Sequence, residues 1–350
     1  MISTYVIFFG FSIVSIIYKL KVRTQEKNAA LTKMDSLAVR GIAALSVMLS
    51  HYALWMESYF YMELPVVFSL LKQLGGIGVL LFFFLSGYGI YLSSDGKTNN
   101  LMWLIKRVGK VWFPYLSMKL VIEIIKYCVI GWNQFLLGDF CREITGFDFS
   151  DWFIWVIILQ YVIFWIAGRI SLNKRLTGIF FQSLMLMVTF IFLKLAPRWY
   201  NGLLLFWFGC FVAKYQEKII RFLKENYYIK LGLLLIGFMG LSIVYLLLKG
   251  SVLTECLKIA SGMILGLILI TILMKFSFQS SILAWIGKRS LFIYIIHVNL
   301  WGTICHEVEN MNLVLPFAVG SAFLVTGLCY KGYECLGRFI KGSKRSICRN

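Results

Sequence analysis

The chain has 350 residues, of which 60% are hydrophobic, 15% are charged and only four are proline. This composition excludes a soluble globular protein and an intrinsically disordered one. The formal net charge of +19 does not indicate nucleic-acid binding, because the basic residues lie between apolar segments and form no continuous basic face. The eight cysteines include no C-x-x-C pair, so the sequence predicts neither a metal site nor a redox motif.

Apolar segments of about 20 residues recur along the whole chain and predict an all-α polytopic membrane protein with about eleven spans. The first expected span lacks the charged n-region and the cleavage site of a signal peptide, so we expect an uncleaved anchor helix. In chain order the spans are expected at about residues 2–18, 37–55, 75–92, 111–131, 152–168, 177–193, 199–213, 231–248, 252–274, 282–301 and 312–330.

The distribution of Lys and Arg predicts the orientation of these spans. Of the 35 basic residues, 26 lie in alternate connecting segments and in the C-terminal tail, 5 lie in the remaining loops and 4 lie within spans. Because cytoplasmic loops carry the excess of Lys and Arg, we expect the N-terminus outside the cell and the C-terminus in the cytoplasm.

The span expected over 37–55 carries two ionisable residues, Arg40 and His51. Their separation places the two side chains within roughly 20° of each other around the helix and about 16 Å apart along it. Ionisable groups inside a bilayer usually face a protein interior or a wet cavity, and histidine is the best general base near neutral pH. The pattern therefore predicts one cavity that receives both side chains; the alternative is a histidine that is only hydrogen-bonded within packed helices. The role of His297, in the span expected over 282–301, stays open.

The next span, expected over 75–92, runs antiparallel and supplies small residues at the depth of His51. The glycines there either leave open space or let the helices approach closely; they are Gly75, Gly76 and Gly78. Ser86 lies nearer the depth of Arg40, where it can hydrogen-bond a ligand or a neighbouring carbonyl.

Basic residues before the span at 111–131 suggest a site for a phosphorylated ligand on the cytoplasmic side. Arg107 and Lys110 are three residues apart and share a helix face if the helix has already started. The positive-inside rule alone also explains them, and on spacing alone it is the favoured interpretation.

Two groups of charges within spans are expected to be structural ion pairs. Glu123 lies four residues after Lys119 and three before Lys126, and Lys258 lies three residues after Glu255. Opposite charges at these spacings are neighbours on a helix surface.

With these residues in view, the sequence resembles membrane acyltransferase family 3, which includes bacterial O-acetyltransferases of surface polysaccharides. Four patterns carry the resemblance in chain order: Arg40, Gly41, Ala43 and His51; Phe82, Phe83, Ser86 and Gly87; Arg107, Lys110, Pro114 and Tyr115; and Ile286, Gly287, Ser290, Ile293, Tyr294 and His297. Two departures stand out. Lys110 replaces the usual second arginine and loses bidentate phosphate contact, and the usual acidic residue before the arginine is Asp35, five residues away instead of three.

The resemblance implies a ten-helix acyltransferase domain over 35–332 in the bacterial cytoplasmic membrane. An extra anchor helix and linker would precede it at 1–34, and a basic cytoplasmic tail would follow at 333–350. It implies an acyl-CoA donor, most often acetyl-CoA, no metal, and no nucleic-acid partner. The acceptor would be a hydroxyl of a glycan or lipid-linked sugar at the membrane lipid surface, and a homodimer is left open.

The resemblance also implies roles for individual residues. His51 would act as the base or as a covalent acyl relay. Arg40 would be the second catalytic residue and would help to hold the negatively charged donor. The donor would be held by Arg107, Lys110, Ser86 and Gly87. The rival hypotheses are an exporter of an unmodified glycan and a structural subunit of a glycan assembly complex.

Overall fold

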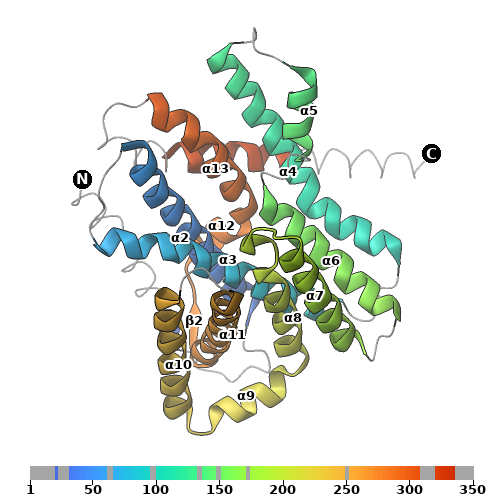
Figure 1. The fold of residues 1–350 in the computed structure, drawn as a ribbon, viewed down its shortest axis with the longest axis vertical. Helices are drawn as coiled ribbons and strands as arrows, with labels where there is room; N and C mark the ends of the chain where they lie inside the picture. Colours follow the sequence, from blue (N-terminus) through green and yellow to red (C-terminus); the bar gives the residue numbers. More distant parts are fainter. Residues whose placement is uncertain are drawn as a thin grey trace.

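The computed structural model describes residues 20–22, 31–60, 66–94, 100–131, 136–146, 151–170, 174–248, 252–307 and 320–335. These form one short strand pair and a bundle of helices (Figure 1). The strands are β1 (Leu20–Val22) and β2 (Phe276–Phe278), and the helices are α2 (Lys33–Phe60), α3 (Val66–Leu92), α4 (Leu101–Ile130), α5 (Leu137–Thr145), α6 (Trp152–Ile170), α7 (Arg175–Phe192), the 3-10 turn η2 (Pro197–Trp199), α8 (Asn201–Lys214), α9 (Gln216–Lys224), α10 (Tyr227–Leu247), α11 (Val252–Lys275), α12 (Ser281–Lys288) and α13 (Ser290–Glu307). Residues 320–335 are also helical. The predicted all-α polytopic membrane fold is confirmed.

Within the described residues, six helices are long and apolar enough to cross a membrane, namely α2, α3, α6, α7, α10 and α11. The bent pair α12 and α13 adds a seventh if it forms one span. Helix α8 has 14 residues and is about 21 Å long, which is shorter than the roughly 30 Å hydrocarbon core of a bilayer. The predicted number of about eleven spans is therefore not confirmed, and the span expected at 2–18 lies outside the described residues.

Helix α3 lies in the middle of the bundle and packs mainly against α2 and α8. Glycines make these close approaches possible. A β-carbon on Gly78 would lie 2.6 Å from the carbonyl oxygen of Ala43, and one on Gly87 would overlap the carbonyl oxygen of Phe206. Because neither position leaves room for a side chain, the small residues of α3 set the distance between the three central helices.

The start of α2 is fixed by a reciprocal capping arrangement. The backbone N–H of Asp35 donates to Thr32 Oγ1 (3.1 Å), and Asp35 Oδ2 accepts from the Thr32 N–H (3.3 Å). Asp35 Oδ1 also accepts from the N–H of Phe278 (2.8 Å), which ties α2 to β2. Strand β2 in turn pairs antiparallel with β1, so this acidic residue anchors one end of the bundle.

The chain predicted to form one span over 282–301 is broken instead. Helices α12 and α13 meet at an angle of 67°. A β-carbon on Gly287 would overlap the carbonyl oxygen of Leu37, so α12 lies in backbone contact with α2. The guanidinium of Arg289, at the break, stacks on the rings of Trp285 and Tyr330 at 4.2 Å from each centroid. The Gly287 contact holds α12 against α2, and the Arg289 contacts connect the break to the helix 320–335.

Two helices begin earlier than expected. Helix α3 starts at Val66 and α4 starts at Leu101. The side chain of Asn100 accepts a hydrogen bond from the Met102 N–H (2.9 Å) and so caps α4. As a result, the basic residues expected before this helix lie within it.

Candidate active site

Two histidines from distant parts of the sequence are hydrogen-bonded to each other in the middle of the bundle. Nδ1 of His51 on α2 lies 2.9 Å from Nε2 of His297 on α13, and the rings stack with their centroids 5.1 Å apart. Nδ1 of His297 lies 2.7 Å from the carbonyl oxygen of Ile293. The hydrogen-bond partner of His51 therefore lies 246 residues away in the sequence.

The partners of His297 fix the roles of the ring nitrogens. A carbonyl oxygen only accepts, so Nδ1 of His297 donates to Ile293. In a neutral His297 the other nitrogen, Nε2, is then the acceptor, and Nδ1 of His51 donates to it. This leaves Nε2 of His51 with a free lone pair. The pair therefore presents His51, and not the buried His297, as a base or nucleophile.

His51 lines an outer cavity of about 370 Å³. The polar residues around this cavity come from α2, α3, η2, α8 and α11; they are Ser50, Lys72, Arg198, Asn201 and Lys258. Its volume falls within the range of small-molecule sites. The cavity is therefore large enough to bring a substrate group to His51.

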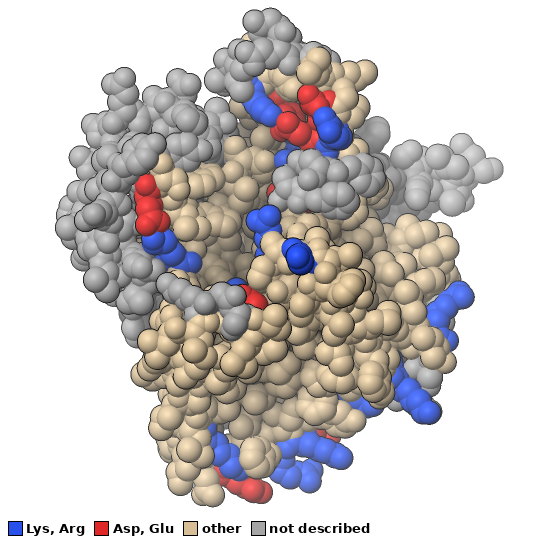
Figure 2. Space-filling view, in the orientation of Figure 1, with Lys and Arg blue, Asp and Glu red and all other residues tan. Residues whose placement is uncertain are grey.

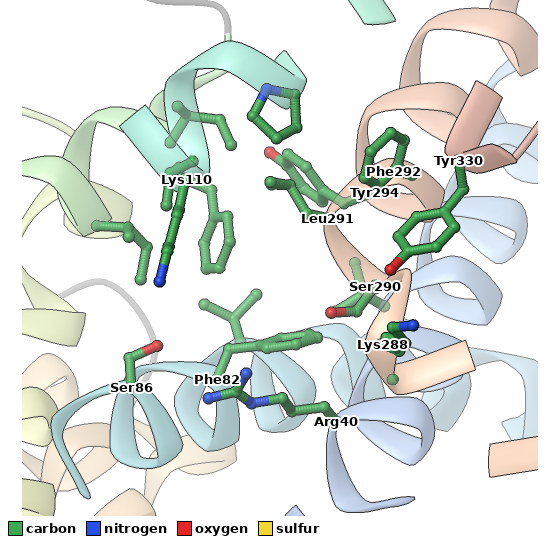
Figure 3. Close-up of a pocket in the computed structure, with 18 of the residues that line it drawn as sticks. Arg40, Phe82, Ser86, Lys110, Lys288, Ser290, Leu291, Phe292, Tyr294 and Tyr330 are labelled. Atoms are coloured by element: carbon green, nitrogen blue, oxygen red, sulfur yellow. The ribbon is translucent and has the colours of Figure 1, made fainter. Parts of the chain in front are cut away.

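Arg40 lines a second, inner cavity of about 390 Å³ together with Ser86 and Lys110. Figure 3 shows these three side chains, from α2, α3 and α4, pointing into the same space. No Asp or Glu is among the residues that line this cavity in the described parts of the chain. The inner cavity is therefore suited to a negatively charged ligand.

The two cavities meet at three shared residues, Val47, Val79 and Tyr294. The expectation of one cavity for both Arg40 and His51 is thus corrected. The two residues do lie on one face of α2, but they line neighbouring cavities that share these three residues. The result is a pair of compartments that touch near the histidine pair.

Two further residues that were expected to bind the donor lie outside both cavities. Nη2 of Arg107 donates to Ser93 Oγ (2.7 Å), and the guanidinium lies 5.5 Å from the ring centroid of Trp103. Gly87 faces the backbone of Phe206. The described contacts of Arg107 and Gly87 are therefore within the protein, whereas Ser86 and Lys110 face the inner cavity.

The glycines at the depth of His51 divide between the two roles foreseen for them. A β-carbon on Gly75 would lie 2.5 Å from Ser50 Oγ, so that glycine serves close packing of α3 on α2. At Gly76 only Lys258 Cε lies within 4 Å, at 3.8 Å. Gly76 therefore leaves open space beside the outer cavity.

A buried polar cluster supports the helix that carries His297. Lys119 Nζ on α4 donates to Asn299 Oδ1 on α13 (3.0 Å) and lies 3.2 Å from Asp151 Oδ2. The predicted intrahelical ion pair of Glu123 forms with Lys126 (3.3 Å) and not with Lys119. Lys119 instead connects α4 to α13, two residues beyond His297.

The ion pair predicted between Lys258 and Glu255 is also not formed among the described residues; the carboxylate of Glu255 accepts from Asn201 Nδ2 (2.6 Å). Lys258 lines the outer cavity instead. A lysine inside an apolar span is a candidate for a functional residue. The i,i+3 spacing favoured an ion pair with Glu255 instead, so the sequence did not indicate Lys258 as a site residue.

Comparison with known proteins identifies the family. Residues 36–331 match the family described as an acyltransferase domain, that of acyltransferase family 3. No curated protein and no solved structure matches the chain. The match covers more than half of the chain and includes every residue that lines the two cavities except Tyr333. The chain therefore belongs to the membrane acyltransferases of family 3.

Proposed function

We propose that the protein transfers an acyl group from acyl-CoA to a hydroxyl of a glycan or lipid-linked sugar. The observation that carries this proposal is the meeting of two cavities beside the His51–His297 pair. Both cavities are lined by cations, and the outer cavity is also lined by His51. Two substrates can thus react at the junction without sharing one site. A glycan exporter without acyl transfer is not favoured by the family match.

The inner cavity suits the donor because two of its lining cations, Arg40 and Lys110, form no ion pair with a described carboxylate. The third, Lys288, pairs with Glu334 (3.2 Å). Arg40 makes no hydrogen bond or ion pair with any described residue, so its guanidinium is available to the phosphates of acyl-CoA. Lys110 provides a second positive charge. We place this cavity on the cytoplasmic side of the bacterial membrane, where acyl-CoA is found and where basic segments concentrate.

The distance between Arg40 and His51, about 16 Å along the helix, requires a donor with a long arm. The pantetheine arm of acyl-CoA is such a group. With the phosphates near Arg40 and Lys110, the arm extends toward Val47 and Tyr294, which line both cavities. The thioester then reaches the junction beside His51.

Two routes use Nε2 of His51. As a base, it accepts the proton of the acceptor hydroxyl while the oxygen attacks the thioester carbonyl; the C–S bond breaks and the CoA thiolate takes up a proton. As a relay, Nε2 attacks the thioester itself, CoA leaves, and the hydroxyl then takes the acyl group from the imidazole. Both routes end in an ester and free CoA thiol.

The test is the O-acyl content of glycans in cells that lack the gene and receive a plasmid copy. The wild type is expected to restore a specific O-acyl group, measured by mass spectrometry or NMR. His51→Ala removes the base or nucleophile and is expected to lower transfer by about 10²–10⁴-fold while the protein still inserts into the membrane.

Ser46→Ala is the matched control on the same helix. Its hydroxyl donates to the backbone carbonyl of Ile42 (3.0 Å) and lines neither cavity, so full acylation is expected. Equal acylation by wild type and His51→Ala would rule out both routes.

A further inference from the structure

We propose that the acceptor is an anionic amphiphile, in which a sugar is joined through a phosphate group to a long apolar chain. The inference rests on the proposed function, because it names the molecule that brings the hydroxyl to His51. It comes from a third cavity, which borders the outer cavity at Gly76, Leu80 and Lys258.

The third cavity is apolar and lies between α3, α10 and α11. It has a volume of about 310 Å³ and is lined largely by hydrocarbon side chains, among them Ile77, Phe238, Leu246 and Leu265. Figure 1 shows α10 beside α11 at the edge of the bundle. No residue in the apolar part of α10 is buried within the protein, so in a membrane this helix faces lipid. An apolar chain can therefore enter the cavity from the bilayer.

Lys258 stands where the apolar cavity meets the outer cavity. It lies in the apolar helix α11, and its Nζ is 6.0 Å from the ring centroid of Tyr245. It forms no ion pair with a described carboxylate. A charge at this depth is costly unless it meets an opposite charge or water. An anionic ligand group at the junction would supply that opposite charge.

Arg198, in the wall of the outer cavity, is a second cation. Arg198 lines the cavity and forms no ion pair among the described residues, whereas Lys72 is neutralised by Glu57 (2.6 Å). Figure 2 shows Lys and Arg side chains beside a hollow in the middle of the face drawn. No carboxylate lines the outer or the apolar cavity in the described parts of the chain. Arg198 and Lys258 together match the charge of a phosphate.

Asn201 offers a hydrogen bond to the sugar. Its side chain is 5% exposed, and its Nδ2 donates to Glu255 Oε2 (2.6 Å). Because a carboxylate only accepts, this bond fixes the orientation of the amide. Asn201 Oδ1 is then left as a buried acceptor without a partner, and such a group is costly until a donor reaches it. A sugar hydroxyl is a donor of the right kind.

The three observations give the ligand an order in space. The apolar chain lies between α3, α10 and α11, the phosphate lies at Lys258 and Arg198, and the sugar lies between Asn201 and His51. Gly76 keeps the passage between the cavities open, because a β-carbon there would meet only Lys258 Cε, at 3.8 Å. A large side chain at this position would close the passage.

The test is photolabelling of the purified full-length protein in lipid nanodiscs with hexadecyl phosphate that carries a diazirine in its chain. We expect label on peptides of α10 and α11. Unlabelled hexadecyl phosphate is expected to displace it, whereas inorganic phosphate and the neutral hexadecyl maltoside are not. Displacement by inorganic phosphate alone would overturn the part of the proposal that concerns the lipid. Equal displacement by the maltoside would overturn the part that concerns the anion.

Variants localise the binding. The double change Arg198→Gln and Lys258→Gln, and separately Gly76→Leu, are each expected to lower labelling at least about tenfold. Lys258→Arg keeps the charge and is expected to retain labelling. Lys275→Gln is the matched control, since it removes a charge from the same helix outside all three cavities. Undiminished labelling in the double variant would contradict the proposal.

Photolabelling and acyl transfer, measured on the same proteins, test the lipid site and the transferase activity separately. Labelling of the wild type and of His51→Ala alike, without any acyl transfer by the wild type, would refute the transferase and leave the lipid site standing. Acyl transfer that depends on His51, without labelling by the lipid probe, would support the transferase and refute the lipid site.

Discussion

At the scale of single residues, the histidine pair is the feature that gives the site its chemistry. His297 is 1% exposed and uses Nδ1 to donate to its own helix, so its remaining nitrogen can only orient His51. This is the arrangement by which a buried partner selects the tautomer of a catalytic histidine. We therefore propose that His297 is a positioning residue.

Replacing His297 tests this role. His297→Phe keeps the bulk of the ring but cannot accept from His51 Nδ1–H, so we expect kcat to fall by roughly 10²-fold with little change in the KM for acyl-CoA. His297→Gln can present an amide oxygen to the same N–H and is expected to recover part of the rate. Steady-state kinetics of the two purified variants measure the difference. Equal kcat values in both variants would assign His297 to packing alone.

The sequence singled out His51 and Arg40 because ionisable residues in an apolar span stand out, and each of them lines a cavity. It could not predict the contact between His51 and His297, which joins residues 246 positions apart and depends on how α2 and α13 pack. It also could not show that Val47 and Tyr294 are shared by two neighbouring cavities, since side-chain volume between helices is a tertiary property.

At the scale of elements, α3 organises the bundle through its glycines. Gly87 belongs to the motif that suggested donor binding, yet it contacts the backbone of Phe206 on α8. Its neighbour Ser86 faces the inner cavity. The motif therefore combines a packing residue with a cavity residue on adjacent positions of one helix.

Gly87→Ala separates packing from ligand binding. The added methyl group overlaps the Phe206 carbonyl, so we expect the free energy of unfolding to fall by about 1–3 kcal/mol, measured by thermal unfolding in detergent. Gly232→Ala on α10 is the control, because no atom lies within 4 Å of its β-carbon position. Unchanged stability with a raised KM for acyl-CoA would instead assign Gly87 to the donor site.

Most of the long helices were predicted from their apolar runs, including α6, α7, α10 and α11. The broken helix α12–α13 was not predicted, because its turn at Arg289 arises from contacts of Gly287 with α2 and of Arg289 with two aromatic rings. The strand pair β1–β2 was also missed. Three-residue strands leave no periodic signal in a sequence.

At the scale of the whole molecule, the charges predict how the bundle sits in the membrane. Figure 1 shows α5 and α9 at opposite ends. Helix α9 and its flanking turns lie in one of the basic connecting segments, whereas α5 lies in a loop of the opposite set. If the positive-inside rule holds, α9 and the inner cavity face the cytoplasm and α5 faces outward.

Two exposed native cysteines test this orientation. Cys141 lies on α5 and Cys335 lies at the end of the helix 320–335. In variants that keep only one of them, we expect a membrane-impermeant maleimide added to intact cells to label Cys141 and to label Cys335 only after permeabilisation. The reverse pattern would place the N-terminus inside.

In the proposed reaction, a donor in the inner cavity and an acceptor in the outer cavity meet at His51. The most direct measurement uses proteoliposomes of oriented protein, glycolipids extracted from the source cells and labelled acetyl-CoA added to one side only. We expect label in the glycolipid only when the donor is on the side of the C-terminus, and only with His51 intact. Labelling from the opposite side, or undiminished labelling by His51→Ala, would contradict the account.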